Sequence, residues 1–336
     1  MLRYLKLVYL WRYWPKEILY FPLTVYVLLI EALRTRRCFY FAAANPEISL
    51  GGFAGDSKFE ILQHVPEHLK PKTVLVKKGM PFIEVEQLIH HMVYPIIAKP
   101  DIGEGGFKVK KIYSVYELID YHYRNKMDYL IQSFCAGPIE LTILFHLEDN
   151  HFKVNSIVER IPFVVKGDGS SKIKDLMLQS DAGFYHQNRL KKMFGKQLEE
   201  VPMKGEIRSA GDIGNWDAGA VYKECSNLIS PEFLKSFNAI MHTIGVFNYG
   251  RADIKCSRYS DLLTAQYKFL EINGVKGEPV QIYDGKYTLW QAYKIIFRQW
   301  NIIRQLSLLN IKKGFSCPNF FEGWGILLRH AWHKLH

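Results

Sequence analysis

The segment YPIIAKPDIGEGGF, residues 94–107, carries a lysine out of an apolar run and directly into a glycine-rich turn. The run Ile96–Ala98 has the character of a buried strand, so Lys99 brings a positive charge to the end of that strand. Backbone amides can approach an anion closely at the glycines that follow, Gly103, Gly105 and Gly106. A lysine beside such a loop suggests a phosphate site, although on this segment alone a glycine-rich surface turn is the favoured interpretation.

The common phosphate-binding motifs are absent from the chain. Neither GxxxxGK[ST] nor GxGxxG occurs, so an ordinary P-loop nucleotide triphosphatase and a Rossmann dinucleotide site are not supported. The phosphate hypothesis therefore depends on a second group of residues elsewhere in the sequence.

That second group lies in YGRADIKC (249–256) and KFLEINGV (268–275), which have the pattern of two neighbouring strands. Side chains alternate between the faces of a strand, so Arg251 and Asp253 share one face, and so do Glu271 and Asn273. A carboxylate inside an apolar strand is costly unless it is paired. Oxygen ligands suit a hard cation such as Mg²⁺, which usually takes its remaining ligands from phosphate and water. These strands therefore predict a metal site close to bound phosphate.

The composition is that of a globular protein. The chain has 336 residues, of which 48% are hydrophobic and 23% are charged, which is enough for two cores. The net charge of +11 is concentrated near the two ends, and no nucleic-acid-binding motif accompanies it, so nucleic acid is not an expected partner. Five scattered cysteines without a CxxC pair argue against a disulfide framework and favour the cytoplasm.

Residues 1–45 combine aromatic side chains, arginines and the apolar run Ile18–Ile30. A membrane-spanning helix needs about 20 apolar residues, and this run is shorter and interrupted by Pro22. Two hypotheses remain equal: a helical hairpin packed on the main domain, or a peripheral contact with the inner membrane surface.

Strand-like and helix-like runs alternate after residue 46 and predict a mixed α/β, or α+β, fold. We expect an aromatic and basic helical segment (1–48), a reduced first region with a small lobe (49–134), a large lobe (135–310) and a basic tail (311–336). The expected strands are 73–76, 96–98, 129–132, 140–145, 155–158, 249–256 and 267–272, and the expected helices are 85–92, 115–123, 232–244 and 289–308.

Five stretches in a fixed order resemble the ATP-grasp superfamily, in the branch of D-alanine–D-alanine ligase and cyanophycin synthetase. They are GDSKFEIL, YPIIAKPDIGEGGF, YLIQSFCAGPIELTI, YGRADI and FLEING, and the resemblance covers about residues 50–310. It implies an ATP-grasp fold in which two lobes clasp ATP. The short segment before residue 49 would then stand in place of a full N-terminal domain.

The resemblance also implies roles for individual residues. Lys58 and Lys99 would hold the ATP phosphates, and the loop 103–106 would fold over them. The backbone of the hinge would read adenine, and Glu140 would bind the ribose hydroxyls; the hinge residues are Gln132, Ser133, Phe134 and Cys135.

On the metal side, Asp253, Glu271 and Asn273 would hold two Mg²⁺ ions, with Mn²⁺ as a substitute. Arg251 would steady the transferred phosphoryl group, so that Arg251 and Lys99 are the expected catalytic residues. VVKGDGSSKIKDLM (164–177) is similar to a segment of the cyanophycin synthetase branch, in which Lys166 or Lys172 would add a phosphate contact.

The implied activity is ATP-dependent ligation of a small-molecule or peptide carboxylate to an amine through an acyl phosphate, with release of ADP and phosphate. Two of the departures from the family bear on the substrate: 57 residues precede Lys58, and Gly274–Glu278 stands where D-alanine–D-alanine ligases have a serine–proline–glycine stretch. These departures argue against D-alanine as the substrate. A kinase of the same fold and a non-catalytic, membrane-associated ATP-binding protein are the alternatives, and the loop 209–222 is either a mobile substrate cover or a plain surface loop.

Overall fold

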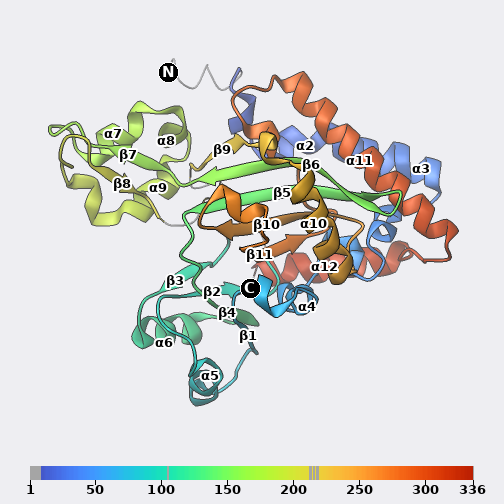
Figure 1. Cartoon of the computed structure of the whole chain (residues 1–336), viewed down its shortest axis with the longest axis horizontal. Helices are drawn as coiled ribbons and strands as arrows, with labels where there is room; N and C mark the ends of the chain where they lie inside the picture. The colour runs from blue at the N-terminus through green and yellow to red at the C-terminus, as the bar shows by residue number, and fades with distance from the viewer. Residues whose placement is uncertain (1–8, 104–105, 212–213, 215, 217–218, 336) are drawn as a thin grey trace.

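The computed structural model describes residues 9–103, 106–211, 214, 216 and 219–335 of the chain, without the side chains of 332–335. Figure 1 shows two lobes, each built around its own β-sheet, with long helices on the outside of the larger one. We call residues 73–133 the small lobe, and we call the second sheet with the helix α10 the large lobe.

The small lobe is a four-stranded antiparallel sheet in the order β1-β4-β2-β3. Its alternating apolar side chains, among them Val76, Ile96 and Ile131, pack against the two helices that cover one face. The elements are β1 (Thr73–Val76), α5 (Phe82–Ile89), β2 (Ile96–Pro100), β3 (Lys110–Ile112), α6 (Val115–Arg124) and β4 (Tyr129–Ser133).

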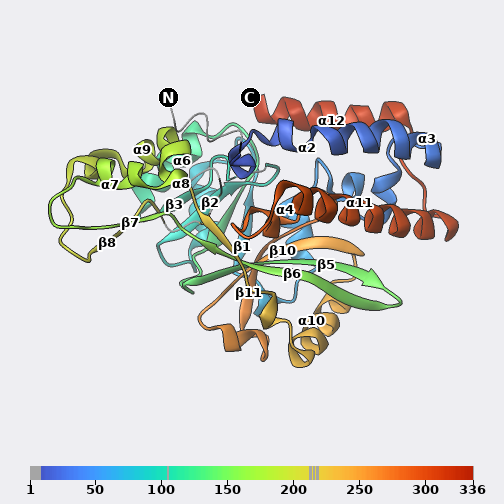
Figure 2. The ribbon, with the colours of Figure 1, turned by 90° about the horizontal axis from the view of Figure 1, so that it is seen from above.

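The large lobe is a five-stranded antiparallel sheet in the order β11-β10-β5-β6-β9. Alternation along β5 places Ile143 in the core beneath α10 and Leu144 in the core beneath α11, so both faces of the sheet are covered. Figure 2 shows the sheet between these two helices. The elements are β5 (Ile139–Glu148), β6 (His151–Ile161), β9 (Val221–Glu224), α10 (Pro231–Ile244), β10 (Tyr249–Cys256), β11 (Tyr267–Asn273) and α11 (Leu289–Lys312).

Helix α4 (Lys58–Gln63) fixes the junction between the lobes. Ser57 caps it by accepting a hydrogen bond from the backbone amide of Glu60, which satisfies one of the free amides of the first turn. Asp101, directly after β2, accepts hydrogen bonds from the Ser57 hydroxyl and the Phe59 amide. The end of the Lys99 strand is thereby tied to the start of the helix that carries Lys58.

The N-terminal segment forms a continuous helical stretch made of α2 (Lys16–Val25), the π-helical turn η2 (Tyr26–Glu31) and α3 (Ala32–Thr35). Pro22 lies within α2, so the prediction that it interrupts the run was wrong. Pro22 is exposed, so the carbonyl that loses its partner can turn toward water. Leu19, Leu23 and Val27 share one core with residues of α11, so this face packs on the main body, but as one continuous helical stretch and not as the expected hairpin.

The end of the chain also packs on the body. Residues 311–336 were expected to be a basic tail, but α12 (Phe320–Leu335) forms there, and Ile326 and Leu327 pack against the same core as α2. The sequence gives the physical reason, because apolar residues recur every three to four positions between Phe320 and Leu328.

A small subdomain between β6 and β9 was not expected as a separate unit. It has its own core, which includes Phe163, Ile173 and Leu190, and it stands beside the large sheet in Figure 1. Its elements are β7 (Val164–Lys166), α7 (Ile173–Gln179), α8 (Asp181–Tyr185), α9 (Gln187–Phe194) and β8 (Ile207–Ser209). Short 3₁₀ turns connect the larger elements, namely η1 (Trp11–Tyr13), η3 (Tyr40–Ala44), η4 (Ser49–Gly52), η5 (Glu67–Leu69), η6 (Gly195–Glu199), η8 (Ser226–Leu228), η9 (Tyr259–Leu262) and η10 (Val280–Tyr283).

Candidate active site

A cavity of about 550 Å³ lies between the two lobes, within the size range of small-molecule sites. The residues predicted from five separate stretches of sequence line this one cavity, with Gly105 alone falling outside the described residues. They are Lys58, Lys99, Gly103, Gly106, Gln132, Ser133, Phe134, Cys135, Glu140, Arg251, Asp253, Glu271 and Asn273.

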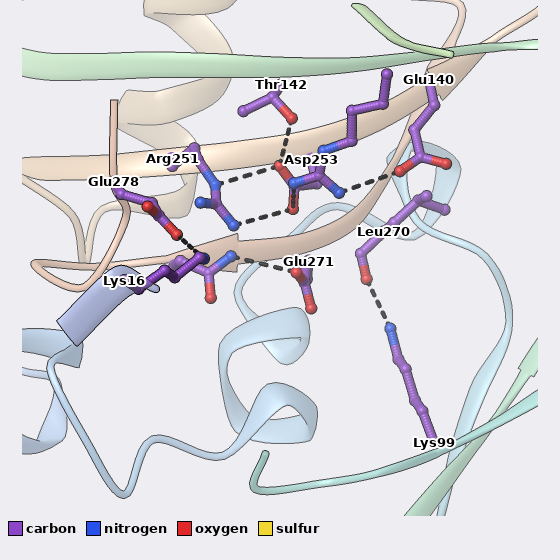
Figure 3. A network of polar contacts seen from close by, with 11 residues as sticks. Lys16, Lys99, Glu140, Thr142, Arg251, Asp253, Leu270, Glu271 and Glu278 are labelled. Atoms are coloured by element: carbon purple, nitrogen blue, oxygen red, sulfur yellow. Dashed lines mark hydrogen bonds and ion pairs between the residues drawn. The ribbon is translucent and has the colours of Figure 1, made fainter. Parts of the chain in front are cut away.

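The two predicted metal-binding carboxylates face each other across neighbouring strands. The register of β10 and β11 pairs Asp253 with Glu271, and it pairs Arg251 with Asn273. Thr142 Oγ1, on the adjacent strand β5, donates a hydrogen bond of 2.9 Å to Asp253 Oδ1. Figure 3 shows these side chains gathered at one place on the large sheet.

Burial and the neighbouring charges shift the pKa values of the two carboxyl groups in opposite directions. Burial raises the pKa of Asp253, even though Arg160 and Arg251 oppose the rise. Burial alone would also raise the pKa of Glu271, but Lys58 and Lys99 outweigh it and hold that pKa below the usual range. The Glu271 carboxylate is therefore charged and faces the two lysines predicted to hold phosphate.

The donor set fits Mg²⁺ bound together with phosphate. The described part of the chain has no group of three or more His, Cys, Asp or Glu side chains that could hold a metal ion alone. Asp253, Glu271 and Asn273 instead supply two carboxylates and an amide, and Mg²⁺ is usually bound by one or two carboxylates plus phosphate oxygens and water. These three residues could hold the ion in that manner.

The two predicted phosphate lysines enter from the side of the small lobe. Lys99 Nζ donates a hydrogen bond of 3.0 Å to the backbone carbonyl of Leu270, which a bulge opposite Asp253 and Ile254 leaves out of the strand pairing. Lys58 Nζ donates to the carbonyl oxygens of Asp101 at 3.2 Å and Gly103 at 2.5 Å. Burial lowers the pKa of both lysines.

The predicted hinge is the end of β4 and the residues after it. The side-chain amide of Gln132 donates a hydrogen bond of 3.0 Å to the Thr73 hydroxyl. This bond joins β4 to β1. The Phe134 ring contacts two ammonium groups, with Lys111 Nζ at 3.9 Å and Lys255 Nζ at 5.2 Å from its centroid. These contacts hold the hinge at the rim of the cavity.

Arg160, which no sequence motif indicated, links two of the predicted site residues. On β6, its guanidinium donates to Glu140 Oε1 at 3.1 Å and to Asp253 Oδ2 at 2.7 Å. Although burial opposes it, the neighbouring carboxylates raise the pKa of Arg160 far above its usual range. The predicted strand ended at Val158, whereas β6 continues to Ile161, and alternation along the longer strand places Arg160 on the same face as Val158.

A second missed feature is the wall that the N-terminal segment supplies. Lys16, the first residue of α2, lines the cavity and forms an ion pair of 2.5 Å with Glu278. Hydroxyl groups of Tyr20 and Tyr283 donate to the same carboxylate at 2.8 Å and 3.1 Å. Lys16 of the N-terminal segment thus contributes to one wall of the cavity.

The loop 209–222 reaches the cavity through Gly214 and Trp216. The Trp216 ring stacks on Tyr283 with centroids 4.7 Å apart and on Tyr13 of the N-terminal segment at 5.6 Å. Residues 212, 213, 215, 217 and 218 lie outside the described residues, so the predicted covering role stays a prediction. Lys166 and Lys172 belong to the β7–β8 subdomain and are not among the cavity-lining residues, and Lys172 pairs with Glu199 instead.

Comparison with known proteins gave matches to solved structures alone. No protein-family model and no curated protein matches the chain. A D-alanine–D-alanine ligase from Bacillus anthracis is 16% identical with a TM-score of 0.43, over 76% of this chain and 68% of the ligase. VanG D-Ala:D-Ser ligase from Enterococcus faecalis is 14% identical with a TM-score of 0.41, over 73% of this chain and 61% of the ligase.

A bifunctional glutathione synthetase from Pasteurella multocida is 12% identical with a TM-score of 0.39, over 72% of this chain and 35% of the synthetase. The matches include ligases of the kind that the sequence motifs resemble, but they are distant. The predicted α+β fold with two lobes around a central cavity is confirmed by the sheets and the cavity of this chain itself.

Proposed function

We propose that this chain is a Mg²⁺-dependent ligase of the ATP-grasp type that activates a carboxylate as an acyl phosphate and joins it to an amine. The observation that carries the proposal is that lysines suited to phosphate and oxygen ligands suited to Mg²⁺ line the same cavity. Lys58 and Lys99 enter from one side, and the Asp253–Glu271 pair with Asn273 lies on the other.

The charge of the cavity suits a polyphosphate. Its lining includes more cationic than anionic side chains: Lys16, Lys58, Lys99, Arg160, Arg251, Lys255 and Lys276 against Glu140, Asp253, Glu271 and Glu278. Attack of a carboxylate on the γ-phosphate brings two anions together, so positioning and charge neutralisation are the main tasks of the protein.

Each part of the site has a role in this scheme. When bound, Mg²⁺ would neutralise the charge that develops on the phosphate oxygens. Asp253, Glu271 and Asn273 would hold two such ions, and Lys58 and Lys99 would orient the phosphates. Arg251, whose guanidinium lies 3.4 Å from Asp253 Oδ1, would steady the phosphoryl group during transfer. The hinge 132–135 would receive adenine, with Glu140 near the ribose.

The proposed reaction has two steps. A carboxylate oxygen of the substrate attacks the γ-phosphorus, the bond to the β–γ bridging oxygen breaks, and ADP leaves. The amine then attacks the acyl carbon, the bond to the phosphate oxygen breaks, and phosphate leaves while the amine nitrogen loses a proton. The acyl phosphate reacts with water, so the lobes must close over it between the steps.

The site for the acid and the amine is the part of the cavity walled by the N-terminal segment. Lys16, Trp216, Glu278 and Tyr283 line that part, so the wall differs in origin from a separate α/β domain. We therefore expect a carboxylate substrate other than D-alanine, either a small molecule or a peptide. The five scattered cysteines favour the cytoplasm as the location of the reaction.

The test is ADP release with Mg²⁺ and ATP against amino acids, dipeptides and hydroxy acids, each with and without an amine. The proposal predicts ADP release that needs both the acid and the amine, with the amide found by mass spectrometry. ADP release without an amine, leaving a stable phosphorylated product, would establish a kinase instead. ATP binding without turnover on any mixture would favour the non-catalytic alternative.

A further inference from the structure

Two helices from opposite ends of the chain present apolar side chains outward on one face of the molecule. Figure 2 shows α2, α3 and α12 along the edge that lies opposite α10. We propose that this face, formed by α2–α3 and α12, docks in the plane of an anionic lipid bilayer.

The first half of this face is a stripe along α2 and η2. Phe21 is 65% exposed and Leu29 is 59% exposed, and exposed apolar residues recur at three- to four-residue spacing along the stripe. The stripe comprises Ile18, Phe21, Val25, Leu28, Leu29 and Leu33. The opposite side of the same helix, with Leu19 and Leu23, is buried on the body. Such a helix, with one side on protein and one apolar side outward, suits a position within an interface.

The second half of this face is on α12. Phe321 is 83% exposed, and Phe320, Trp324 and Leu328 are exposed with it, while Gly323 and His330 face the body. Aromatic side chains of this kind are enriched at the level of lipid headgroups. The two halves together far exceed the scattered single apolar residues that are normal on a soluble surface.

Exposed basic side chains lie on or close to the helices of this face. The Cys317 thiol donates a hydrogen bond of 3.7 Å to the Tyr40 carbonyl, which links the segment before α12 to η3, the turn that follows α3. The exposed arginines and lysines are Arg34, Arg36 and Arg37 at the end of α3, Lys312 and Lys313 at the end of α11, and Arg329 within α12, against Glu17 and Glu322. Their charge is complementary to anionic headgroups.

The geometry favours a helix that lies on the membrane over one that crosses it. The stretch Lys16–Thr35 is long and apolar enough to span by length and composition. However, Glu31 is buried at 1% exposure, and its carboxylate contacts Arg34 at 3.0 Å and Arg304 of α11 at 3.5 Å. Crossing would break these contacts and expose the α11 core, whereas docking in the plane keeps them.

A lipid surface fits this face better than a second copy of the chain. The chain carries a net charge of +11, so a second copy would bring the same sign of charge to this face, whereas an anionic bilayer is complementary to it. The helix also begins at Lys16 in the cavity wall, so the docked face and the active site share one rigid element.

The experiment is flotation of the full chain, without nucleotide, with vesicles of phosphatidylcholine alone or with one part in four phosphatidylglycerol. The docking variant is F21S/L29S/F321S. The control is I83S/Y116S, which removes side chains of 61% and 79% exposure from α5 and α6 of the small lobe. Thermal unfolding confirms that both variants remain folded, and light scattering reports their oligomeric state.

Docking predicts that the wild-type chain floats with the anionic vesicles, and that the docking variant loses at least about tenfold in partitioning while the control does not. Weaker flotation with neutral vesicles is expected from the basic ends. No flotation, or equal losses in both variants, would overturn the proposal. A wild-type dimer that the docking variant dissolves, without vesicle binding, would assign the face to self-association. None of these readouts depends on ligase activity.

Discussion

Asp253 is the residue on which most of the site converges. Its carboxylate accepts a hydrogen bond from Thr142 of β5 and forms ion pairs with Arg160 of β6 and Arg251 of its own strand. It is also paired in register with Glu271 on the neighbouring strand β11. Its neighbours on β10 could be predicted, because alternation alone places Arg251 and Asp253 on one face. Arg160 could not, because its link to Asp253 joins residues 93 positions apart and depends on the strand order of the sheet.

Removal of Arg160 should be costly to folding. In R160Q, the buried carboxylates of Glu140 and Asp253 lose a charged partner, and such a loss typically costs about 3–5 kcal/mol. Urea unfolding should show this decrease in the free energy of unfolding. The control R124Q removes an exposed pair with Asp120 and should change it by less than about 1 kcal/mol. A loss for R160Q as small as that of the control would show that the guanidinium is dispensable.

Replacement of Glu271 tests the metal side of the site. E271Q keeps the shape but removes the charge that faces Lys58 and Lys99, so we expect ADP formation to fall by a factor of about 100 or more. Steady-state ADP release measures the effect. E60Q, on the exposed side of α4, serves as the control and should retain full activity. Activity near the wild-type level in E271Q would remove this residue from the machinery.

At the scale of elements, periodic patterns predicted the strands and helices that build the two lobes. The predicted strands 73–76 and 249–256 agree with β1 and β10, and alternation within 249–256 and 268–275 placed their polar side chains correctly. The N-terminal segment was less predictable, because a helix that packs on α11 and a helix at a membrane surface share one apolar composition. The contribution of Lys16 to the cavity wall depends on tertiary packing, which no local pattern encodes.

The two sides of α2 and η2 should respond differently to truncation. Leu23 is buried in the core shared with α11, so L23A should lower the free energy of unfolding by about 2–4 kcal/mol. Leu29 is exposed on the same helical stretch, so L29A should change it by less than about 0.5 kcal/mol. Chemical denaturation measures both. Equal effects would mean that the segment does not pack on α11 in solution.

For the whole molecule, separate apolar cores belong to the small lobe and to the large lobe, so the lobes can move relative to each other. The sequence predicted both lobes from the order of the motifs. It did not predict the β7–β8 subdomain, whose short elements lack a long periodic pattern, or the layer in which both ends of the chain pack together. These features depend on contacts between residues far apart in sequence.

Closure of the lobes should follow nucleotide binding. Lys99 of the small lobe already contacts the Leu270 carbonyl of the large lobe, and bound phosphates would attract both sides of the cavity. We expect Mg²⁺ with a non-hydrolysable ATP analogue to reduce the radius of gyration in small-angle scattering. No change in the scattering curve at saturating analogue would contradict closure.

The most direct test of the central claim, that the cavity between the lobes is a Mg²⁺–ATP site, is calorimetric titration with that analogue. It needs no knowledge of the acid or the amine. We predict binding that weakens at least tenfold without Mg²⁺ and is lost in K99M, while K126M, an exposed position in the small lobe, binds like the wild type. Binding that is unaffected by Mg²⁺ and by K99M, or no binding at all, would contradict the account.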